Sequence, residues 1–225
     1  MTGDIPLLVD LIDVNNEPQI RRDAISLLEV IGQHSNDLSN FCEGNIPAAL
    51  VKAASVRTFD AEFQRPMFSL LARIANNPNL LNPLIESNEF LIVLVRSLSN
   101  AALRDPALNL ASTIAMDPTH KGKIALVNSD IFSSLAVFIE SRDIILRRTT
   151  LSLFALLTVP REGKHRLSTD RDIPDTINRI ASSDPDQKCR EAAQIIRRLV
   201  SELPLGEAII GSNIDSPHDL SIADI

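Results

Sequence analysis

Residues 130–154 read DIFSSLAVFIESRDIILRRTTLSLF, and both halves of this stretch recur along the chain. The first half is an acidic or polar residue, an isoleucine or phenylalanine, often a proline, and then an aliphatic run. Its copies are Asp4-Ile5-Pro6, Asn45-Ile46-Pro47, Glu89-Phe90-Leu91, Asp130-Ile131-Phe132 and Asp172-Ile173-Pro174. The apolar residues of successive copies are 41, 44, 41 and 42 residues apart. Such a constant spacing indicates an internal repeat.

The second half gives an independent marker with the same period. Its copies are Arg22-Asp-Ala-Ile-Ser-Leu-Leu, Arg65-Pro-Met-Phe-Ser-Leu-Leu, Asp105-Pro-Ala-Leu-Asn-Leu-Ala, Arg148-Thr-Thr-Leu-Ser-Leu-Phe and Arg190-Glu-Ala-Ala-Gln-Ile-Ile. The central polar residues follow one another after 43, 40, 43 and 42 residues. Two markers with one period predict a stack of similar units.

Each unit is predicted to be helical, because its apolar residues recur at spacings of three and four. Residues suited to a helix start open most of the long segments: Glu17-Pro18, Asp60, Asp143 and Asp184-Pro185. A shorter helix is expected to end each of the first four units, over Leu38–Glu43, Asn79–Glu86, His120–Val127 and Glu162–Ser168.

Composition agrees with an all-α protein. The 225 residues are 44% hydrophobic but only 4% aromatic, with seven glycines, so Leu, Ile, Ala and Val must form the core. No apolar stretch reaches the roughly 18 residues of a membrane span, and the start lacks the features of a secretory signal. Cys42 and Cys189 fit neither a metal spacing nor a disulfide framework. The sequence therefore leaves two locations open, the nucleus and the cytoplasm.

The run Gly44-Asn45-Ile46-Pro47-Ala48-Ala49-Leu50-Val51 resembles the second-helix signature of armadillo repeats, and the period lies in the armadillo and HEAT range. The resemblance implies an all-α, armadillo-like right-handed α-solenoid of about five repeats over residues 1–202. The expected repeats lie near 5–44, 45–88, 89–129, 130–171 and 172–202. Residues 203–225, which break the pattern with Pro204, Gly206, Gly211 and Pro217, are predicted to be an irregular extension.

No catalytic or cofactor-binding pattern is present in the sequence. The four histidines, His34, His120, His165 and His218, fall in predicted turns or short helices of different units, where surface histidines are common. Phosphate-binding glycine loops and nucleophile elbows are absent. We therefore expect no catalytic residues, no cofactor, no metal and no small-molecule substrate.

Armadillo proteins line a concave groove with their third helices, and importin-like members place Trp and then Asn on that face in each repeat. The matching pairs here are Ser26 and Val30, Ser69 and Arg73, Asn109 and Thr113, Ser152 and Leu156, and Gln194 and Arg198. The Trp–Asn pair is absent from all of them. Recognition of nuclear localisation signals in the importin manner is therefore disfavoured.

One turn earlier on the same face stand Arg22, Arg65, Asp105, Arg148 and Arg190. We predict a protein-binding groove formed by Arg22, Ser26, Arg65, Ser69, Arg73, Asn109, Arg148, Ser152, Arg190, Gln194 and Arg198. Its arginines suit an acidic or mixed peptide. The alternative is that each arginine pairs with an acidic residue of the neighbouring unit. Direct binding of nucleic acid is disfavoured by the net charge of −7 and by the absence of Trp and Tyr.

The order of segments also resembles the C-terminal armadillo-like domain of the large AT-rich-interaction-domain subunit of SWI/SNF chromatin remodellers. The resemblance lies in three stretches: Ile31-Gly32-Gln33 with Asp37-Leu38-Ser39, Gln64-Arg65 with Leu70 to Ile74, and Arg147-Arg148 to Val159 with Glu162 and Arg171. The chain lacks that family's tryptophan-rich stretch and its DNA-binding module, so it would be a fragment or a divergent member. The resemblance implies a structural core around which other subunits of a multi-protein complex assemble.

The predicted function is therefore a non-enzymatic protein-binding scaffold in a chromatin-remodelling complex that regulates transcription. The alternative is an adaptor or transport receptor that binds acidic or mixed linear peptides in the groove. Solenoid ends need polar caps, and the aliphatic run Ile5 to Leu11 lacks one. Leu8 and Leu11 are therefore expected to contact a partner or another copy.

Overall fold

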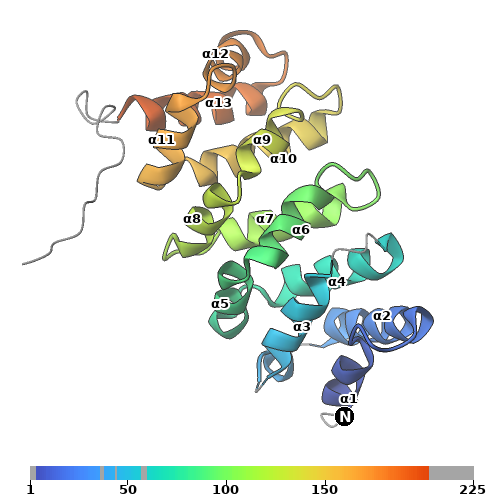
Figure 1. Ribbon diagram of the computed structural model, residues 1–225. Coiled ribbons are helices and arrows are strands. Elements are labelled where there is room, and N and C mark those ends of the chain that lie inside the picture. Colours follow the sequence, from blue (N-terminus) through green and yellow to red (C-terminus); the bar gives the residue numbers. More distant parts are fainter. Residues whose placement is uncertain (1–3, 36–37, 44, 57–59, 203–225) are drawn as a thin grey trace, which may run out of the picture.

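The computed structural model describes residues 4–35, 38–43, 45–56 and 60–202. Within them the chain forms thirteen α-helices and one short 3-10 helix, η1, and no strand. The helices follow one another along a single elongated stack (Figure 1). The predicted all-α fold is confirmed. The predicted extension, 203–225, lies outside the described residues.

The longest helices form one row in which each member packs on the next. Its members are α2 (Pro18–His34), α4 (Ala61–Ile74), α7 (Arg104–Ala115), α10 (Ile144–Leu157) and α13 (Gln187–Ser201). Helices of different sequence regions, about 40 residues apart, therefore lie side by side in chain order (Figure 1).

Two further rows cover this one. The middle row contains α1 (Asp4–Leu11), α3 (Ile46–Ala54), α6 (Asn88–Ser97), α9 (Ile131–Ala136) and α12 (Ile173–Ser183). The short row contains η1 (Ser39–Cys42), α5 (Pro78–Glu86), α8 (Lys121–Asn128) and α11 (Arg161–Thr169). Each predicted unit thus places one helix in each row, except that the described part of the last unit has no short helix.

Aspartates start three of the long helices, as side-chain caps of free backbone amides. Asp60 accepts hydrogen bonds from the amides of Glu62 and Phe63 at 3.1 and 3.4 Å. Asp143 does the same for the second and third residues of α10, at 2.9 and 3.3 Å. These two positions agree with the helix starts predicted from the sequence.

The predicted start of the last long helix, at Asp184-Pro185, is wrong by two residues. Asp186 is the cap, since its carboxylate accepts from the amide of Cys189 at 3.0 Å, and α13 begins at Gln187. Asp184 is instead bound to Arg147 of α10. Both aspartates suit a cap, and only the contact with the neighbouring helix separates their roles.

The core is aliphatic, with phenylalanines at intervals. Phe68, Phe90, Phe132 and Phe154 are all at most 2% exposed. The rings of Phe132 on α9 and Phe154 on α10 lie 5.0 Å apart between centroids, at a tilted angle that favours aromatic contact. Each ring joins the middle row to the long row, so the core runs continuously through the stack.

Two of the seven glycines allow the short row to approach the long row closely. A Cβ added at Gly163 of α11 would lie 1.7 Å from the carbonyl oxygen of Leu157 at the end of α10. At Gly122 of α8 it would lie 2.2 Å from the carbonyl oxygen of Ile114. Only glycine fits there without moving the backbone.

Candidate functional site

The exposed side of the long row carries every groove residue that the sequence predicted. We call this surface the long-helix face. Its members are Arg22 and Ser26 on α2, Arg65, Ser69 and Arg73 on α4, Asn109 on α7, Arg148 and Ser152 on α10, and Arg190, Gln194 and Arg198 on α13. None of them is buried. Residues four apart on one helix share a side, so the face is a ladder of similar steps.

Two arginines of the long-helix face are bound within the solenoid. The Nε atom of Arg22 donates to Asp60 Oδ2 at 2.9 Å, and the Nε atom of Arg148 donates to Asp186 Oδ1 at 2.9 Å. Each aspartate is the cap of the next long helix. Pairing between neighbouring units, which the sequence left open as an alternative, is therefore the arrangement of these two arginines.

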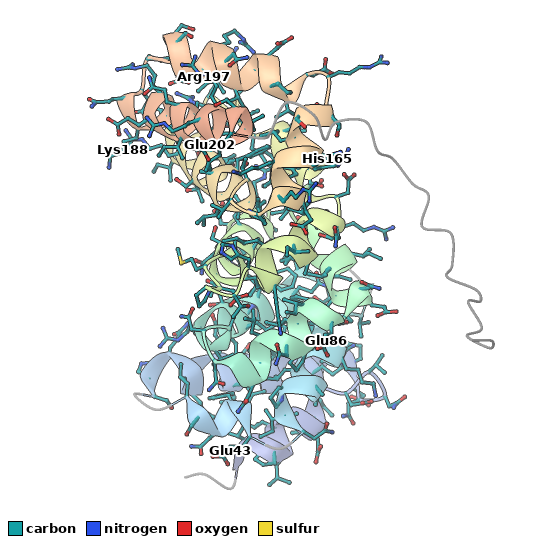
Figure 2. The ribbon with its side chains drawn as sticks, turned by 90° about the vertical axis from the view of Figure 1, so that its left-hand side faces the viewer. Glu43, Glu86, His165, Lys188, Arg197 and Glu202 are labelled. Atoms are coloured by element: carbon teal, nitrogen blue, oxygen red, sulfur yellow. The ribbon has the colours of Figure 1, made fainter. Side chains whose placement is uncertain are left out.

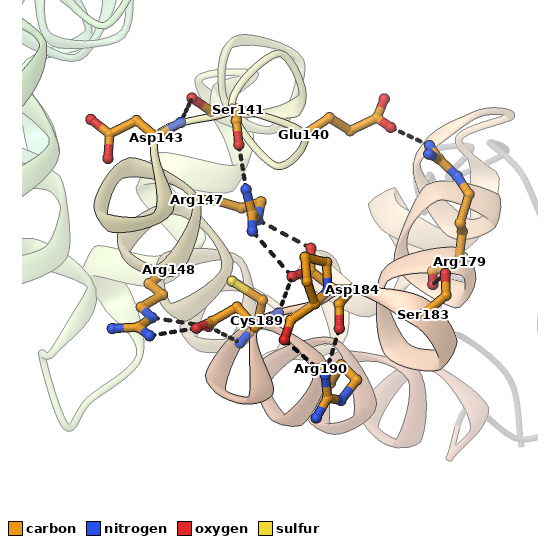
Figure 3. A network of polar contacts seen from close by, with 12 residues as sticks. Glu140, Ser141, Asp143, Arg147, Arg148, Arg179, Ser183, Asp184, Cys189 and Arg190 are labelled. Carbon is orange, nitrogen blue, oxygen red and sulfur yellow. Dashed lines mark hydrogen bonds and ion pairs between the residues drawn. The ribbon is translucent and has the colours of Figure 1, made fainter.

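The contact between α10 and α13 has a second, buried ion pair (Figure 3). Arg147 Nη2 donates to Asp184 Oδ1 at 3.1 Å, and the two side chains are only 10% and 8% exposed. Arg147 also donates to the carbonyl of Ser141 at 2.5 Å, and Arg190 donates to the carbonyl of Asp184 at 2.6 Å. Adjacent arginines thus hold the last long helix by two separate aspartates.

The sequence analysis assigned no binding role to Arg147 and took Asp184 for a helix start. The signal that was available is the arginine doublet at 147–148 together with two aspartates 37 and 38 residues later. Its meaning depends on knowing that α10 and α13 are neighbours, which the sequence period alone suggests only roughly.

Arg148 changes the acidity of its partner. Its hydrogen bonds hold the pKa of Asp186 well below the usual range, and the amide of Cys189 acts in the same direction. Desolvation raises the pKa of Asp60, but Arg22 and the two cap amides outweigh it, so that pKa is also lowered. Both carboxylates are therefore charged at neutral pH.

The lowered pKa of Asp186 predicts that the contact between α10 and α13 is sensitive to acid. A carboxylate with a lowered pKa stabilises the fold above the unfolded pKa of about 4 and loses that contribution as the pH falls further. We expect urea midpoints of the wild type to fall more steeply between pH about 5 and 3 than those of Asp186→Asn. In an Arg148→Ala background the same substitution should change the slope much less. Equal slopes for wild type and Asp186→Asn would contradict the assignment.

Two further arginines of the face bind backbone carbonyls, which carry no charge. Arg73 donates to the carbonyls of Gly32 and Gln33 at 3.0 and 3.4 Å, and so completes the end of α2. Arg190 donates to the carbonyls at 184 and 185. Their positive charges thus remain uncompensated by these contacts, unlike those of Arg22 and Arg148.

Arg65 and Arg198 are exposed, and their side chains make no hydrogen bond or ion pair with the described residues. Ser26 and Ser152 are exposed as well, whereas Gln194 donates to the carbonyl of Ala181 at 3.3 Å and so turns toward α12. The groups available to a partner are therefore a subset of the predicted face.

The two ends of the stack differ in character. Leu27 is 53% exposed, although the equivalent residues Leu70, Leu110 and Leu153 are buried against the preceding long helix. At the other end α13 presents charged groups, among them Lys188, Arg197 and Glu202 (Figure 2). The N-terminal end thus exposes Leu27, whereas α13 carries charged groups together with one exposed aliphatic residue at the equivalent position, Ile195.

The predicted N-terminal contact needs a correction at one residue. Leu8 is only partly exposed and packs against the core, because it faces the helices that follow. Leu11 is 41% exposed, and Leu7, which the sequence analysis passed over, is 64% exposed. The apolar surface of α1 is therefore centred on Leu7 and Leu11.

The histidines are spread over different helices in the part of the chain that is described. His34, His120 and His165 lie on α2, at the start of α8 and in α11, while His218 lies outside the described residues. Burial raises the pKa of the Cys189 thiol, so it stays protonated at neutral pH. Among the described residues no three His, Cys, Asp or Glu side chains are placed to share a metal ion. None of the helices described has the length and apolar character of a membrane span.

Known structures with this arrangement are armadillo repeat proteins. A computationally designed armadillo repeat protein for modular peptide recognition matches with a TM-score of 0.71 and 19% identity, over 88% of this chain and 82% of that one. A designed armadillo repeat protein in complex with the peptide (KR)4 matches with a TM-score of 0.70 and 19% identity, over the same shares. An engineered protein matches with a TM-score of 0.62 and 18% identity, over 88% of this chain and 97% of that one.

The fold is therefore that of an armadillo repeat solenoid, as the sequence predicted. No protein-family model matches the chain, and no curated protein matches it. The more specific resemblance to the remodeller subunit stays a prediction.

Proposed function

We propose that this protein is a non-enzymatic scaffold that binds an extended segment of a partner protein along its long-helix face. The observation that carries the proposal is the repeated, exposed, polar step on successive long helices, with Ser26, Asn109 and Ser152 as members. A peptide in extended conformation exposes all its backbone groups and alternate side chains, so it suits a ladder of similar polar steps. The fold itself is one that commonly serves as a binding scaffold.

One of the designed proteins with this fold is in complex with the charged peptide (KR)4, which supports the proposal. Its ligand is entirely basic, and nothing in its sequence carries over at 19% identity. The charges of this chain must therefore define its own ligand. Uncompensated arginines on the face support a segment with acidic residues, which is the adaptor function expected as the alternative from the sequence.

A photo-crosslinking experiment tests the location. Benzophenone is attached to a cysteine introduced at Ser152 on the long-helix face, and in a matched variant at Ser182 on α12, both of which are exposed. Native Cys42 is replaced by serine in both variants, and native Cys189 is buried and should react poorly. We expect captured partners to crosslink through position 152 and not through position 182. Crosslinks at position 182 alone would place binding on the middle row and contradict the proposal.

The same capture, followed by mass spectrometry, separates the two biological settings. Subunits of a chromatin remodeller would support the nuclear scaffold that the resemblance implies. A varied set of cargo or cytoskeletal proteins would support the cytoplasmic adaptor. The comparisons lend no support to the remodeller role, so the peptide-binding function is the one we propose.

A further inference from the structure

Two ion pairs between neighbouring long helices share one sequence spacing, which we call the rule of position. Arg22 reaches Asp60 and Arg148 reaches Asp186, and in both pairs the partners are 38 residues apart. The arginine lies in the first half of one long helix, and the aspartate caps the next. The first and the last junctions of the long row are thus closed by an arginine–aspartate pair.

The two central junctions break this rule. The position 38 residues after Arg65 is Leu103, which precedes α7 and makes no side-chain cap. The position 38 residues after Asp105 is Asp143, the cap of α10. A carboxylate therefore stands in the place from which an arginine would bind Asp143, and Arg65 has no carboxylate to bind.

Arg104, the residue before Asp105, does not supply the missing ion pair. Arg104 lies over the ring of Phe138, with its guanidinium carbon 4.7 Å from the centroid, and donates to the carbonyl of Leu98 at 3.2 Å. In the described part of the chain, neither Asp105 nor Asp143 takes part in an ion pair. Both are exposed. This junction therefore lacks the stabilising arginine–aspartate pair that the two end junctions have.

We propose that the long-helix face binds an extended segment that carries one acidic and one basic side chain. Arg65 on α4 binds the acidic one, and the basic one lies between Asp105 and Asp143, where α7 meets α10. This inference rests on the proposed function and specifies its ligand. A mixed segment satisfies both signs of charge, whereas a purely acidic one meets the two carboxylates and a purely basic one meets Arg65.

The helix spacing sets the distance between the two charges in the ligand. Neighbouring helices pack with their axes about 8–10 Å apart, and an extended chain advances about 3.3 Å per residue. The site between α7 and α10 lies about one and a half helix spacings from α4, roughly 12–15 Å. Because alternate side chains of an extended chain share a side, the acidic and the basic residue of the ligand should be about four residues apart. This spacing places both side chains on positions that one extended segment reaches at once.

A selection from a random displayed peptide library tests the inference. On the wild-type protein we expect peptides enriched in an acidic and a basic residue about four positions apart. Asp105→Arg should lose the basic preference and keep the acidic one, and Arg65→Glu should lose the acidic preference. For a selected peptide, fluorescence anisotropy should show about a tenfold weaker affinity for Asp105→Arg. Asp175→Arg, an equal change on exposed α12, should bind like the wild type.

The melting temperature of Asp105→Arg shows whether weaker binding could result from unfolding. By the rule of position, Asp105→Arg should form the missing pair with Asp143 and raise the melting temperature by about 1–4 °C. Weaker binding by a more stable protein cannot arise from unfolding. An unchanged basic preference in Asp105→Arg would overturn the inference while leaving the proposed function intact. Failure of the wild type to retain any peptide would overturn the proposed function itself.

Discussion

Replacing Asp184 by alanine should lower the free energy of unfolding by about 3–5 kcal/mol, because it leaves the buried guanidinium of Arg147 without its counter-charge. The two side chains are only 10% and 8% exposed, so water does not replace the lost carboxylate fully. The carbonyl of Ser141 remains as a partner of Arg147 but is neutral. Urea unfolding followed by circular dichroism at 222 nm measures the change.

Two controls distinguish the cost of leaving a buried charge unpaired from the cost of losing an ion pair as such. Glu140 pairs with Arg179 on the surface, where both side chains are at least half exposed, and Glu140→Ala should change stability by at most about 1 kcal/mol. The double replacement Arg147→Met with Asp184→Leu should recover most of the stability lost in Asp184→Ala. A loss in Asp184→Ala as small as that in Glu140→Ala would show that the buried charge is not the cause.

Truncating Phe154 to alanine should cost about 3–5 kcal/mol, the usual range for a fully buried phenylalanine. The ring is 0% exposed and contacts Phe132, so the cavity would separate α9 from α10 in the middle of the stack. Because helices on both sides depend on this contact, we also expect amide hydrogen exchange to rise in both helices. Thermal and urea unfolding give the size of the effect.

The matched control for Phe154→Ala is Val137→Ala. Val137 lies just after α9 and is 74% exposed, so its truncation should change stability by no more than about 0.5 kcal/mol. A small effect of Phe154→Ala, similar to that of Val137→Ala, would mean that the core closes around the vacancy. Exchange confined to α10 would mean that the two helices are not coupled through this ring.

The repeat period was enough to predict the fold, because hydrophobic spacing and cap residues are local signals. Asp60 and Asp143 each carry such a signal and were placed correctly as helix starts. The close approach at Gly163 gives no local signal, since only the carbonyl of Leu157 in the assembled stack requires a glycine there. Contacts across the stack are thus what the pattern alone does not contain.

The long-helix face was predictable by position and less so by chemistry. None of the eleven predicted residues is buried, and seven of them are exposed. Which arginines are free depends on the residue that caps the next helix, as the difference between Arg148 and Arg65 shows. Side-chain packing likewise decided that Leu8 turns inward while Leu7 stays exposed.

Asp60 and Asp186 each make two kinds of contact. Each caps the start of its own helix and also accepts a hydrogen bond from an arginine of the preceding long helix. When either helix frays at its start, the same carboxylate is lost to its neighbour. We therefore expect unfolding at each end of the stack to be cooperative over two units, because loss of one helix cap also breaks the ion pair to the preceding long helix. Between these paired ends, α7 is held by apolar packing without such a link, so the stack divides into two cooperative blocks joined at α7.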